Sequence, residues 1–303
     1  MCISVHQLCY VHADKEPLFQ DINLTVNKGQ RLALVGNNGT GKSTLLRIIE
    51  GSLQPSSGEI ICSSRPYYIP QHFGQFDRLT VADALGVDDR IKAFHAILEG
   101  DTSVENFISL NDDWNVEERC LSALAFWDLG HLQLSRPMHS LSGGEKTKVF
   151  LSGILVHAPE IILMDEPTNH LDVASREKLY EMVKNGRSTM LIVSHDRYFI
   201  NKIADRILLL TNNGVKEYLG NYDYYLERTT AEKSGAVPTE NKKDKKEKTQ
   251  NDYFLQKQKQ SEERKRQTKL KKAEAEIERL DEEIAKTPVS YTHLRAHETA
   301  ANL

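Results

Sequence analysis

The most chemically suggestive stretch of the sequence is a glycine-rich loop near its start. Residues 36–44 fit the pattern G-x-x-x-x-G-K-[ST], between a strand-like run and a helix-like run. Glycines adopt positive φ at little cost, so the backbone amides of such a loop can turn inward around a phosphate chain. We expect Lys42 to reach the β- and γ-phosphates and the Ser43 hydroxyl to bind Mg²⁺. The residues of this loop are Gly36, Asn37, Asn38, Gly39, Thr40, Gly41, Lys42, Ser43 and Thr44.

Two adjacent carboxylates follow an apolar run further along the chain. The run covers residues 161–164, and Asp165 and Glu166 come directly after it. A carboxylate at the end of a buried strand suits the Mg²⁺ shell, so we expect Asp165 to contribute to it. Glu166 suits a general base that polarises an attacking water. A strand that ends in two acids indicates hydrolysis.

Three further positions could contact the same phosphate chain. Gln71 and His195 each follow a strand-like run; Gln71 could bind Mg²⁺ and sense the γ-phosphate, and His195 could hold the γ-phosphate and the water. Ser142, Gly143 and Gly144 precede a helix-like run, where they could form an anion site at the helix N-terminus. Each position also has a structural alternative: a surface glutamine, a histidine cap and a serine cap.

The elements that must position these residues alternate between strand and helix over residues 1–228. Short apolar runs at 161–164 and 190–193 predict buried parallel strands. The segment 1–35 is typical of an antiparallel hairpin, and the pattern becomes helical between about 81 and 135. The sequence therefore predicts an α/β domain with a helical subdomain, which we place over about 81–155.

Composition excludes several classes of protein. The chain has 303 residues and a net charge of −4, so nothing global indicates a nucleic-acid partner. Its four cysteines lack metal-ligand spacing, which favours incidental thiols in a reducing compartment. The sequence contains no apolar run of about 18 residues, so no membrane span is predicted. The first residues also lack the basic-then-apolar pattern of a signal peptide.

Beyond about residue 228 the chain becomes strongly charged. We predict a disordered linker over 229–250 and a charged helix or coiled-coil arm over 251–287. Between 242 and 272 there are 13 Lys and Arg against five acids, an excess that could attract rRNA phosphates. A solvated, charged coiled coil is the alternative.

The last segment, 288–303, is set aside. It has no helical or strand pattern and looks like the translation of a transposase-type sequencing adapter in frame with the gene. We therefore expect the natural protein to be longer than this chain. His293 and His297 have helical spacing in this segment, but we assign no metal site to them.

Together and in this order, the motifs closely resemble those of the ATP-binding cassette superfamily. They are the phosphate loop (36–44), the glutamine loop (Gln71), the signature (141–145), the acidic strand (161–166), the aspartate loop (169–172, with Asp172) and the histidine switch (His195). The resemblance covers residues 1–228. It implies a P-loop NTPase cassette fold, with a mixed sheet core, an antiparallel β subdomain and an α-helical subdomain, and it implies ATP and Mg²⁺ as ligands.

The resemblance also implies roles for residues that the pattern alone does not assign. Tyr10 falls where the family places an aromatic side chain that stacks on adenine; a core tyrosine is the alternative. Cassettes of this family pair head to tail, so Ser142 and Gly144 would serve a nucleotide bound by a second cassette.

Residues 167–172 and 194–199 resemble the ABC-F branch, whose members are soluble, carry two cassettes and in many cases act on ribosomes. We therefore expect a cytoplasmic ATPase that modulates translation, with protection against a ribosome-targeting antibiotic as one form of that role. One alternative is the ATPase subunit of a transporter with a separately encoded membrane protein. Another is a nucleotide-gated switch with little turnover, against which Glu166 argues.

Two features depart from the ABC-F pattern. The motif series begins as in a first cassette, yet residues 218–227 resemble the segment that comes after the second cassette in some members. Either this member is unusual, or the sequence joins two genes at the motif 194–197. The stretch between Gln71 and Leu141 also leaves little room for a ribosome-reaching arm, and its loop at 100–113 is not especially basic.

Overall fold

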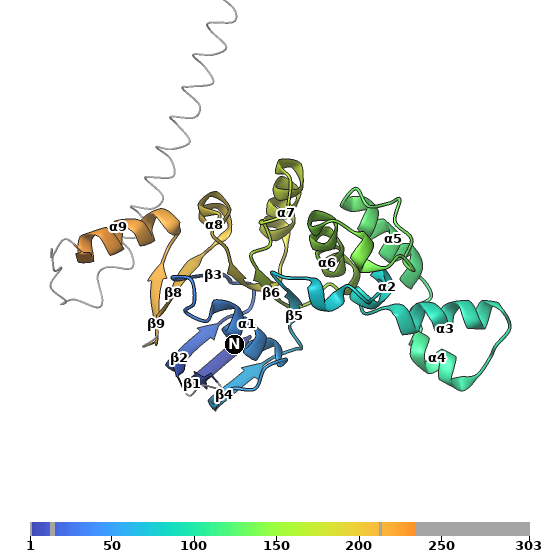
Figure 1. Cartoon of the computed structure of the whole chain (residues 1–303), viewed down its shortest axis with the longest axis horizontal. Helices are drawn as coiled ribbons and strands as arrows, with labels where there is room; N and C mark the ends of the chain where they lie inside the picture. The colour runs from blue at the N-terminus through green and yellow to red at the C-terminus, as the bar shows by residue number, and fades with distance from the viewer. Residues whose placement is uncertain (1, 13–15, 212–213, 234–303) are drawn as a thin grey trace, which may run out of the picture. The chain divides into compact units, whose positions relative to one another are not determined.

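The computed structural model describes residues 2–12, 16–211 and 214–233 (Figure 1). The arm predicted over 251–287 and the segment set aside over 288–303 lie outside these residues, as does most of the predicted linker. The last described helix, α9 (Tyr222–Lys233), continues past residue 228, where we predicted the end of the cassette domain.

A six-stranded sheet lies at the centre of the described residues. Its strand order is β5-β6-β7-β3-β8-β9, and all neighbours are parallel except β8 and β9. The strands are β3 (Arg31–Val35), β5 (Tyr67–Ile69), β6 (Ile161–Asp165), β7 (Thr189–Val193), β8 (Arg206–Thr211) and β9 (Gly214–Leu219). Every residue of β6 and β7 is buried, which explains their continuous apolar pattern. The predicted parallel strands at 161–164 and 190–193 are thus confirmed.

A second, three-stranded antiparallel sheet contains the first residues of the chain. It has the order β2-β1-β4 and consists of β1 (Ile3–Val11), β2 (Pro17–Val26) and β4 (Ser57–Cys62). Helix α1 (Lys42–Glu50) packs into a core shared by the two sheets, because Leu45, Leu46, Ile48 and Ile49 are all buried there. This packing fixes the first turn of α1 near β6.

Alternate residues of β6 belong to two different cores. Ile161 and Leu163 join the core that contains α1, whereas Ile162 and Met164 join the core that contains α6 and α7. Figure 1 shows α6 (Gly143–His157), α7 (Val173–Asn185) and α8 (Arg197–Ile203) on the side of the sheet opposite α1. The layers on both faces hold the end of β6 rigidly.

The helical region lies between β5 and β6 in the chain. It comprises η1 (Gly74–Phe76), α2 (Val81–Ala84), α3 (Asp88–Leu98), α4 (Val104–Leu110), α5 (Val116–Phe126), η2 (Met138–Ser140) and α6. Its helices from α2 to α6 thus span 81–157, where we predicted a helical subdomain over about 81–155. Trp127 is fully buried in its core.

Among the described residues, no helix combines the length and the apolar character that crossing a bilayer requires.

Gly153 on α6 allows a close contact with the edge strand β5. The Tyr67 hydroxyl donates a hydrogen bond to the Phe150 carbonyl at 2.9 Å, and a Cβ at residue 153 would overlap this hydroxyl. In an open helix, Gly→Ala stabilises by about 1 kcal/mol. Here we expect Gly153→Ala to lower the free energy of unfolding by about 1–3 kcal/mol, because the helix and β5 must separate.

Urea denaturation of the purified protein measures this effect. Gly74→Ala is the matched control, because a Cβ at residue 74 meets no heavy atom within 4 Å. In a Tyr67→Leu background, Gly153→Ala should lower the free energy of unfolding by less than it does in the wild type. An equal cost in both backgrounds would contradict the contact as its cause.

Candidate nucleotide-binding site

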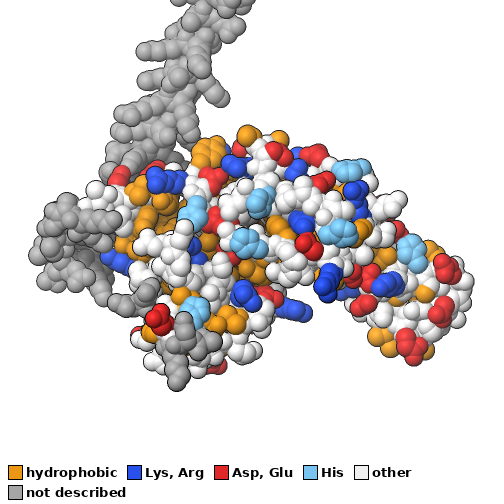
Figure 2. Space-filling model, viewed as in Figure 1, with side chains coloured by type: hydrophobic (Ala, Val, Ile, Leu, Met, Phe, Trp, Pro, Cys, Tyr) orange, Lys and Arg blue, Asp and Glu red, His pale blue; other side chains and the backbone are white. Residues whose placement is uncertain are grey.

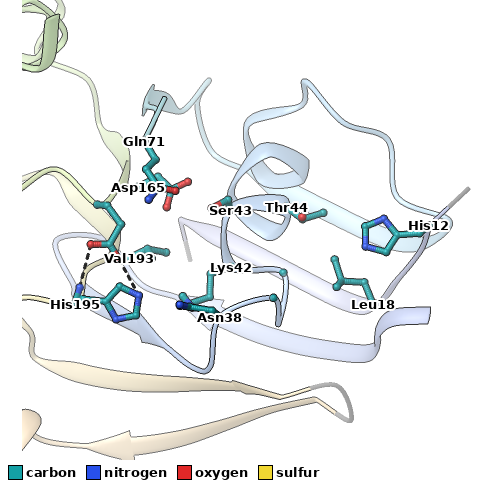
Figure 3. Close-up of a pocket in the computed structure, with 13 residues that line it drawn as sticks. His12, Leu18, Asn38, Lys42, Ser43, Thr44, Gln71, Asp165, Val193 and His195 are labelled. Atoms are coloured by element: carbon teal, nitrogen blue, oxygen red, sulfur yellow. Dashed lines mark hydrogen bonds and ion pairs between the residues drawn. The ribbon is translucent and has the colours of Figure 1, made fainter. Parts of the chain in front are cut away.

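A cavity of about 500 Å³ opens where the parallel strands end and α1 begins (Figure 3). Clefts at the carboxyl ends of parallel strands are the usual ligand sites of such sheets. The cavity brings together predicted residues from four separate parts of the chain: Asn38, Gly39, Gly41, Lys42, Ser43, Thr44, Gln71, Asp165, Glu166 and His195. Motif residues that are far apart in the sequence thus line the same cavity, as a shared phosphate-binding site requires.

The phosphate loop ends in a helix start that is built for an anion. Gly41 precedes α1 with φ of 89°, and no side chain caps the free amides of the first turn. A Cβ on Gly41 would collide with the Leu18 side chain, so only glycine lets the loop pack this closely. Unpaired amides and the positive end of the helix dipole favour a phosphate group at this position.

Lys42 lies inside the loop. Its Nζ donates hydrogen bonds to the carbonyl oxygens of Gly36 and Asn37, both at 2.9 Å. Burial lowers the pKa of Lys42, and the carboxylates of Glu166 and Asp165 partly oppose that shift. The ammonium is therefore held as a preorganised positive charge close to the two acids.

Asp165 is 2% exposed at the end of β6. Its Oδ2 accepts a hydrogen bond from the Tyr68 hydroxyl at 3.3 Å, whereas its buried Oδ1 has no hydrogen-bond partner. Burial raises the pKa of Asp165, and the nearby hydroxyls of Ser43 and Tyr68 partly oppose the shift. A buried carboxylate oxygen without a partner fits a bound cation, since such an oxygen is costly to leave unpaired.

The oxygen ligands around Asp165 fit Mg²⁺. Ser43 and Gln71 line the same cavity, and Figure 3 shows Gln71 beside Asp165. A hydroxyl, an amide oxygen and a carboxylate are the hard oxygen ligands that Mg²⁺ prefers, and Mg²⁺ binds phosphates alongside few protein ligands.

Glu166 is held by its backbone in an unusual conformation. Its φ is +52°, in the left-handed region, and its amide donates to the Val193 carbonyl at 2.9 Å. Non-glycine residues in this region concentrate at functional sites, because the surrounding structure must support the strain. The hydrogen bond to the end of β7 therefore directs the carboxylate into the cavity.

The Glu166 carboxylate lies against His195. Oε2 accepts a hydrogen bond from the His195 amide at 3.1 Å, and Oε1 lies 3.4 Å from Nε2 of the imidazole (the dashed lines at His195 in Figure 3). Glu166 is 6% exposed, and this burial raises its pKa. A carboxylate with a raised pKa is a stronger base, so the arrangement suits proton abstraction from a water.

The signature residues lie elsewhere. Ser142, Gly143 and Gly144 do not line the cavity. Ser142 caps α6, where its side chain and that of Glu145 form a reciprocal capping box. Like the start of α1, this helix start has small residues at its first positions, Gly143 and Gly144, but unlike α1 it is capped by side chains.

The aspartate loop packs beside the signature. The His170 ring contacts the position of a Cβ on Gly143, and Gly144 leaves room for the His170 carbonyl. Asp172 caps α7 and pairs with Lys148 on α6 at 3.2 Å. Hydrogen bonds from Ser175 lower the pKa of Asp172 to about 2. The signature and aspartate loops thus form one surface, separate from the cavity.

Tyr10, predicted to stack on adenine, does not line the cavity; His12 does. The Tyr10 ring packs against Phe19 and His12, with centroids 6.2 and 5.6 Å away. Sequence reasoning missed His12 and Leu18 as cavity residues. The period of two along a strand offered a signal, since residue 12, just past the end of β1, continues the face that carries residue 10.

The remaining loop residues have other positions. Gly36 and Asn37 line a neighbouring cavity of about 430 Å³, together with Asn38 and Lys42. Thr40 lines neither cavity, and its hydroxyl donates to the Asn37 carbonyl at 2.9 Å. Tyr68, whose hydroxyl reaches Asp165, was also missed, because only the β5–β6 register places it there.

The burial of Glu166 predicts a pH-dependent stability difference for Glu166→Gln. Because its pKa is higher in the native state than in the unfolded state, the carboxyl of Glu166 stabilises the fold below its unfolded pKa. This contribution to the free energy of unfolding is lost as the pH rises through the native pKa. The variant has no such charge to bury. We expect its free energy of unfolding, relative to the wild type, to be more favourable at pH 7 than at pH 4.

Urea denaturation of the nucleotide-free protein at both pH values tests this expectation. Glu59→Gln, at an exposed residue of β4, is the matched control and should give no such difference. A pH-independent difference for Glu166→Gln would show that burial does not raise the pKa of this carboxyl.

Several known proteins are similar to this chain in sequence or in fold. The family described as ABC transporter matches residues 19–169. The Bacillus subtilis protein YdiF is 34% identical over 230 residues, which cover 75% of this chain and 32% of that protein. ABC transporter F family member 2 of Arabidopsis thaliana is 33% identical over 226 residues, which cover 75% of this chain and 30% of that protein.

This chain spans about a third of the length of these two relatives. Among solved structures, the dimeric structure of MJ0796, a bacterial ABC transporter cassette, superposes with a TM-score of 0.55 at 23% identity. The match covers 72% of this chain and 98% of that one. Taken with the fold and the cavity, these similarities show the fold of an ATP-binding cassette and support the ATP-binding cassette superfamily as the family of this chain.

Proposed function

We propose that this cassette binds ATP with Mg²⁺ and hydrolyses it in a head-to-tail pair with a second cassette. One observation carries the proposal: Lys42, Asp165, Glu166 and His195 line a single cavity at the uncapped start of α1. A cation, two buried acids and a histidine around an anion-binding helix start suit hydrolysis of a phosphoanhydride better than simple binding.

Each residue has a physical role in the proposed reaction. The amides of α1 and the Lys42 ammonium hold the phosphate chain. Asp165, Ser43 and Gln71 would hold Mg²⁺, which neutralises phosphate charge when bound. Glu166 takes a proton from the water that attacks the γ-phosphate, and His195 positions that water or phosphate beside it.

A second cassette would complete the site. The signature surface lies away from this chain's own cavity, yet it offers a helix N-terminus suited to an anion. It can therefore serve a nucleotide held by another cassette. The solved cassette MJ0796, described as dimeric, supports this pairing. The second cassette could come from another copy of this chain or from a longer protein.

We further propose that the protein belongs to the ABC-F branch and acts on the ribosome in the cytoplasm, where it modulates translation. The motifs at 167–172 and 194–199 support this assignment, as does the similarity to an F family member. The basic stretch at 242–272 would supply attraction to rRNA phosphates. Protection against a ribosome-targeting antibiotic would be one form of this role.

The competing proposal is the ATPase subunit of a membrane transporter. The description of the matched family and that of the solved cassette favour it. The two proposals share the same site chemistry and differ only in the partner, so a partner-binding experiment separates them.

Glu166→Gln should keep ATP affinity and reduce hydrolysis by about 100-fold or more, because the amide accepts no proton. The trapped ATP state should co-migrate with ribosomes in a sucrose gradient when ATP is present and not when it is absent. Lys42→Ala is the control: it should weaken ATP binding by calorimetry and abolish co-migration.

Two outcomes would contradict these proposals separately. Unchanged hydrolysis in Glu166→Gln would remove this residue from the role of base. Loss of hydrolysis without ATP-dependent co-migration would keep the ATPase but reject the ribosome as the partner, which leaves the transporter subunit as the better proposal.

His12, rather than Tyr10, is the side chain that we propose for the adenine. Stacking on an aromatic ring contributes about 1–3 kcal/mol per base. We therefore expect His12→Ala to weaken ATP affinity at least about fivefold, while Tyr10→Leu, beside it, changes affinity less. Calorimetric titration of ATP into both variants measures this. A larger loss in Tyr10→Leu would restore the original assignment.

A further inference from the structure

Helix α4 presents an apolar face to solvent. Val104, Phe107 and Ile108 lie on this helix, Trp114 follows it, and they are 67%, 43%, 71% and 44% exposed. We call these four residues the α4 face. Together they present on the order of 400 Å² of apolar surface, within the range of patches that are often functional in soluble proteins.

The geometry of α4 explains why this face stays uncovered. Val104, Phe107 and Ile108 have the spacing i, i+3, i+4, so they share one side of the helix. The opposite side carries Asn106 and the fully buried Leu110, which packs into the core of the helical region. The helix cannot turn its apolar side inward without exposing Leu110.

The turn after α4 extends the face. Asn111 and Asp112 both have positive φ, 51° and 57°, so the chain reverses direction sharply after the helix. This reversal places Trp114 against Phe107, with ring centroids 6.3 Å apart in an edge-to-face arrangement. An exposed aromatic pair of this kind is a typical anchor at protein–protein interfaces.

The surroundings of the α4 face are strongly acidic. Residues 88–118 contain nine Asp and Glu but only two Lys and Arg. Three of these acids form ion pairs: Asp88 with Lys92, Asp113 with Arg90 and Arg119, and Glu117 with His95. Figure 2 shows acidic and hydrophobic side chains side by side on the lobe that carries α3 and α4.

Three acids close to the face in the sequence have no such partner. Asp101, Glu105 and Asp112 are exposed and form no ion pair with any described residue. Their charges are therefore free to attract a cation on another molecule. The sign of this field also opposes a phosphate backbone.

We propose that the α4 face binds a basic protein segment, in which apolar side chains on one side of a helix are flanked by Lys and Arg. The apolar side would cover Val104, Phe107, Ile108 and Trp114, and the cations would meet Asp101, Glu105 and Asp112. A second copy of this chain fits poorly, because it would bring like charges together. The proposal stands apart from the ATPase cycle.

Fluorescence anisotropy of a labelled peptide tests the proposal on the full chain. The probe is a helical peptide with Leu on one side and Lys on the other, without tryptophan. We expect Val104→Ser with Ile108→Ser to weaken binding about tenfold or more. Glu105→Lys with Asp112→Lys should weaken binding as well, and added salt should do the same.

Matched controls distinguish peptide binding at the α4 face from nonspecific binding elsewhere on the protein. Ile61→Ser and Glu59→Lys change exposed residues of β4 in the same chemical way and should leave peptide affinity unchanged. Trp114 emission should shift to the blue on binding, since the other tryptophan, Trp127, is already buried. Circular dichroism and thermal unfolding of each variant verify that the fold is intact.

Three outcomes would overturn the proposal. One is equal peptide affinity in the wild type and the two α4-face variants. Another is equal binding of a matched peptide with Glu in place of Lys, which would show that charge plays no part. The third is self-association that Val104→Ser with Ile108→Ser abolishes, which would make a second copy the occupant.

Discussion

Burial of two neighbouring carboxylates at the end of β6 is the constraint on which the rest of this cassette depends. Asp165 and Glu166 follow a strand held between two packed cores, and these residues are only 2% and 6% exposed to water. Charged groups in such a place need compensation. The structure supplies it only in part, through Lys42, Tyr68 and His195. The two incompletely compensated carboxylates thus lower the stability of the fold at the place where a cation and a phosphate chain would bind.

The cavity and the signature surface each contain a helix N-terminus that could bind an anion, and they lie at separate places in the fold. One helix start, on α1, lies beside the acids, and another, on α6, lies beside the aspartate loop. Small residues at both starts leave room for an anion to approach the backbone. In the proposed function, approach of two cassettes joins these halves, so nucleotide binding and association become thermodynamically linked.

Much of the site was predictable from sequence, because motif residues that follow buried strands must meet at one sheet edge. Asn38, Lys42, Asp165 and His195 met as expected. The period of two along β1 groups Tyr10 with His12, but it does not predict that His12 lines the cavity and Tyr10 does not, because that depends on where β1 ends. Tyr68 and the Gly153–Tyr67 contact depend on strand register and helix packing, which spacing in the sequence does not encode.

The left-handed backbone at Glu166 has a consequence for how this position can diverge. Branching at Cβ crowds the preceding and following peptide groups in that conformation, so valine, isoleucine and threonine are disfavoured for reasons unrelated to catalysis. If Glu166 has the proposed role, substitution at this position is therefore constrained twice, once by chemistry and once by backbone geometry. A lineage that abandons turnover would drift toward glutamine, asparagine or glycine here, and its inactive descendants would be recognisable by that narrow substitution spectrum.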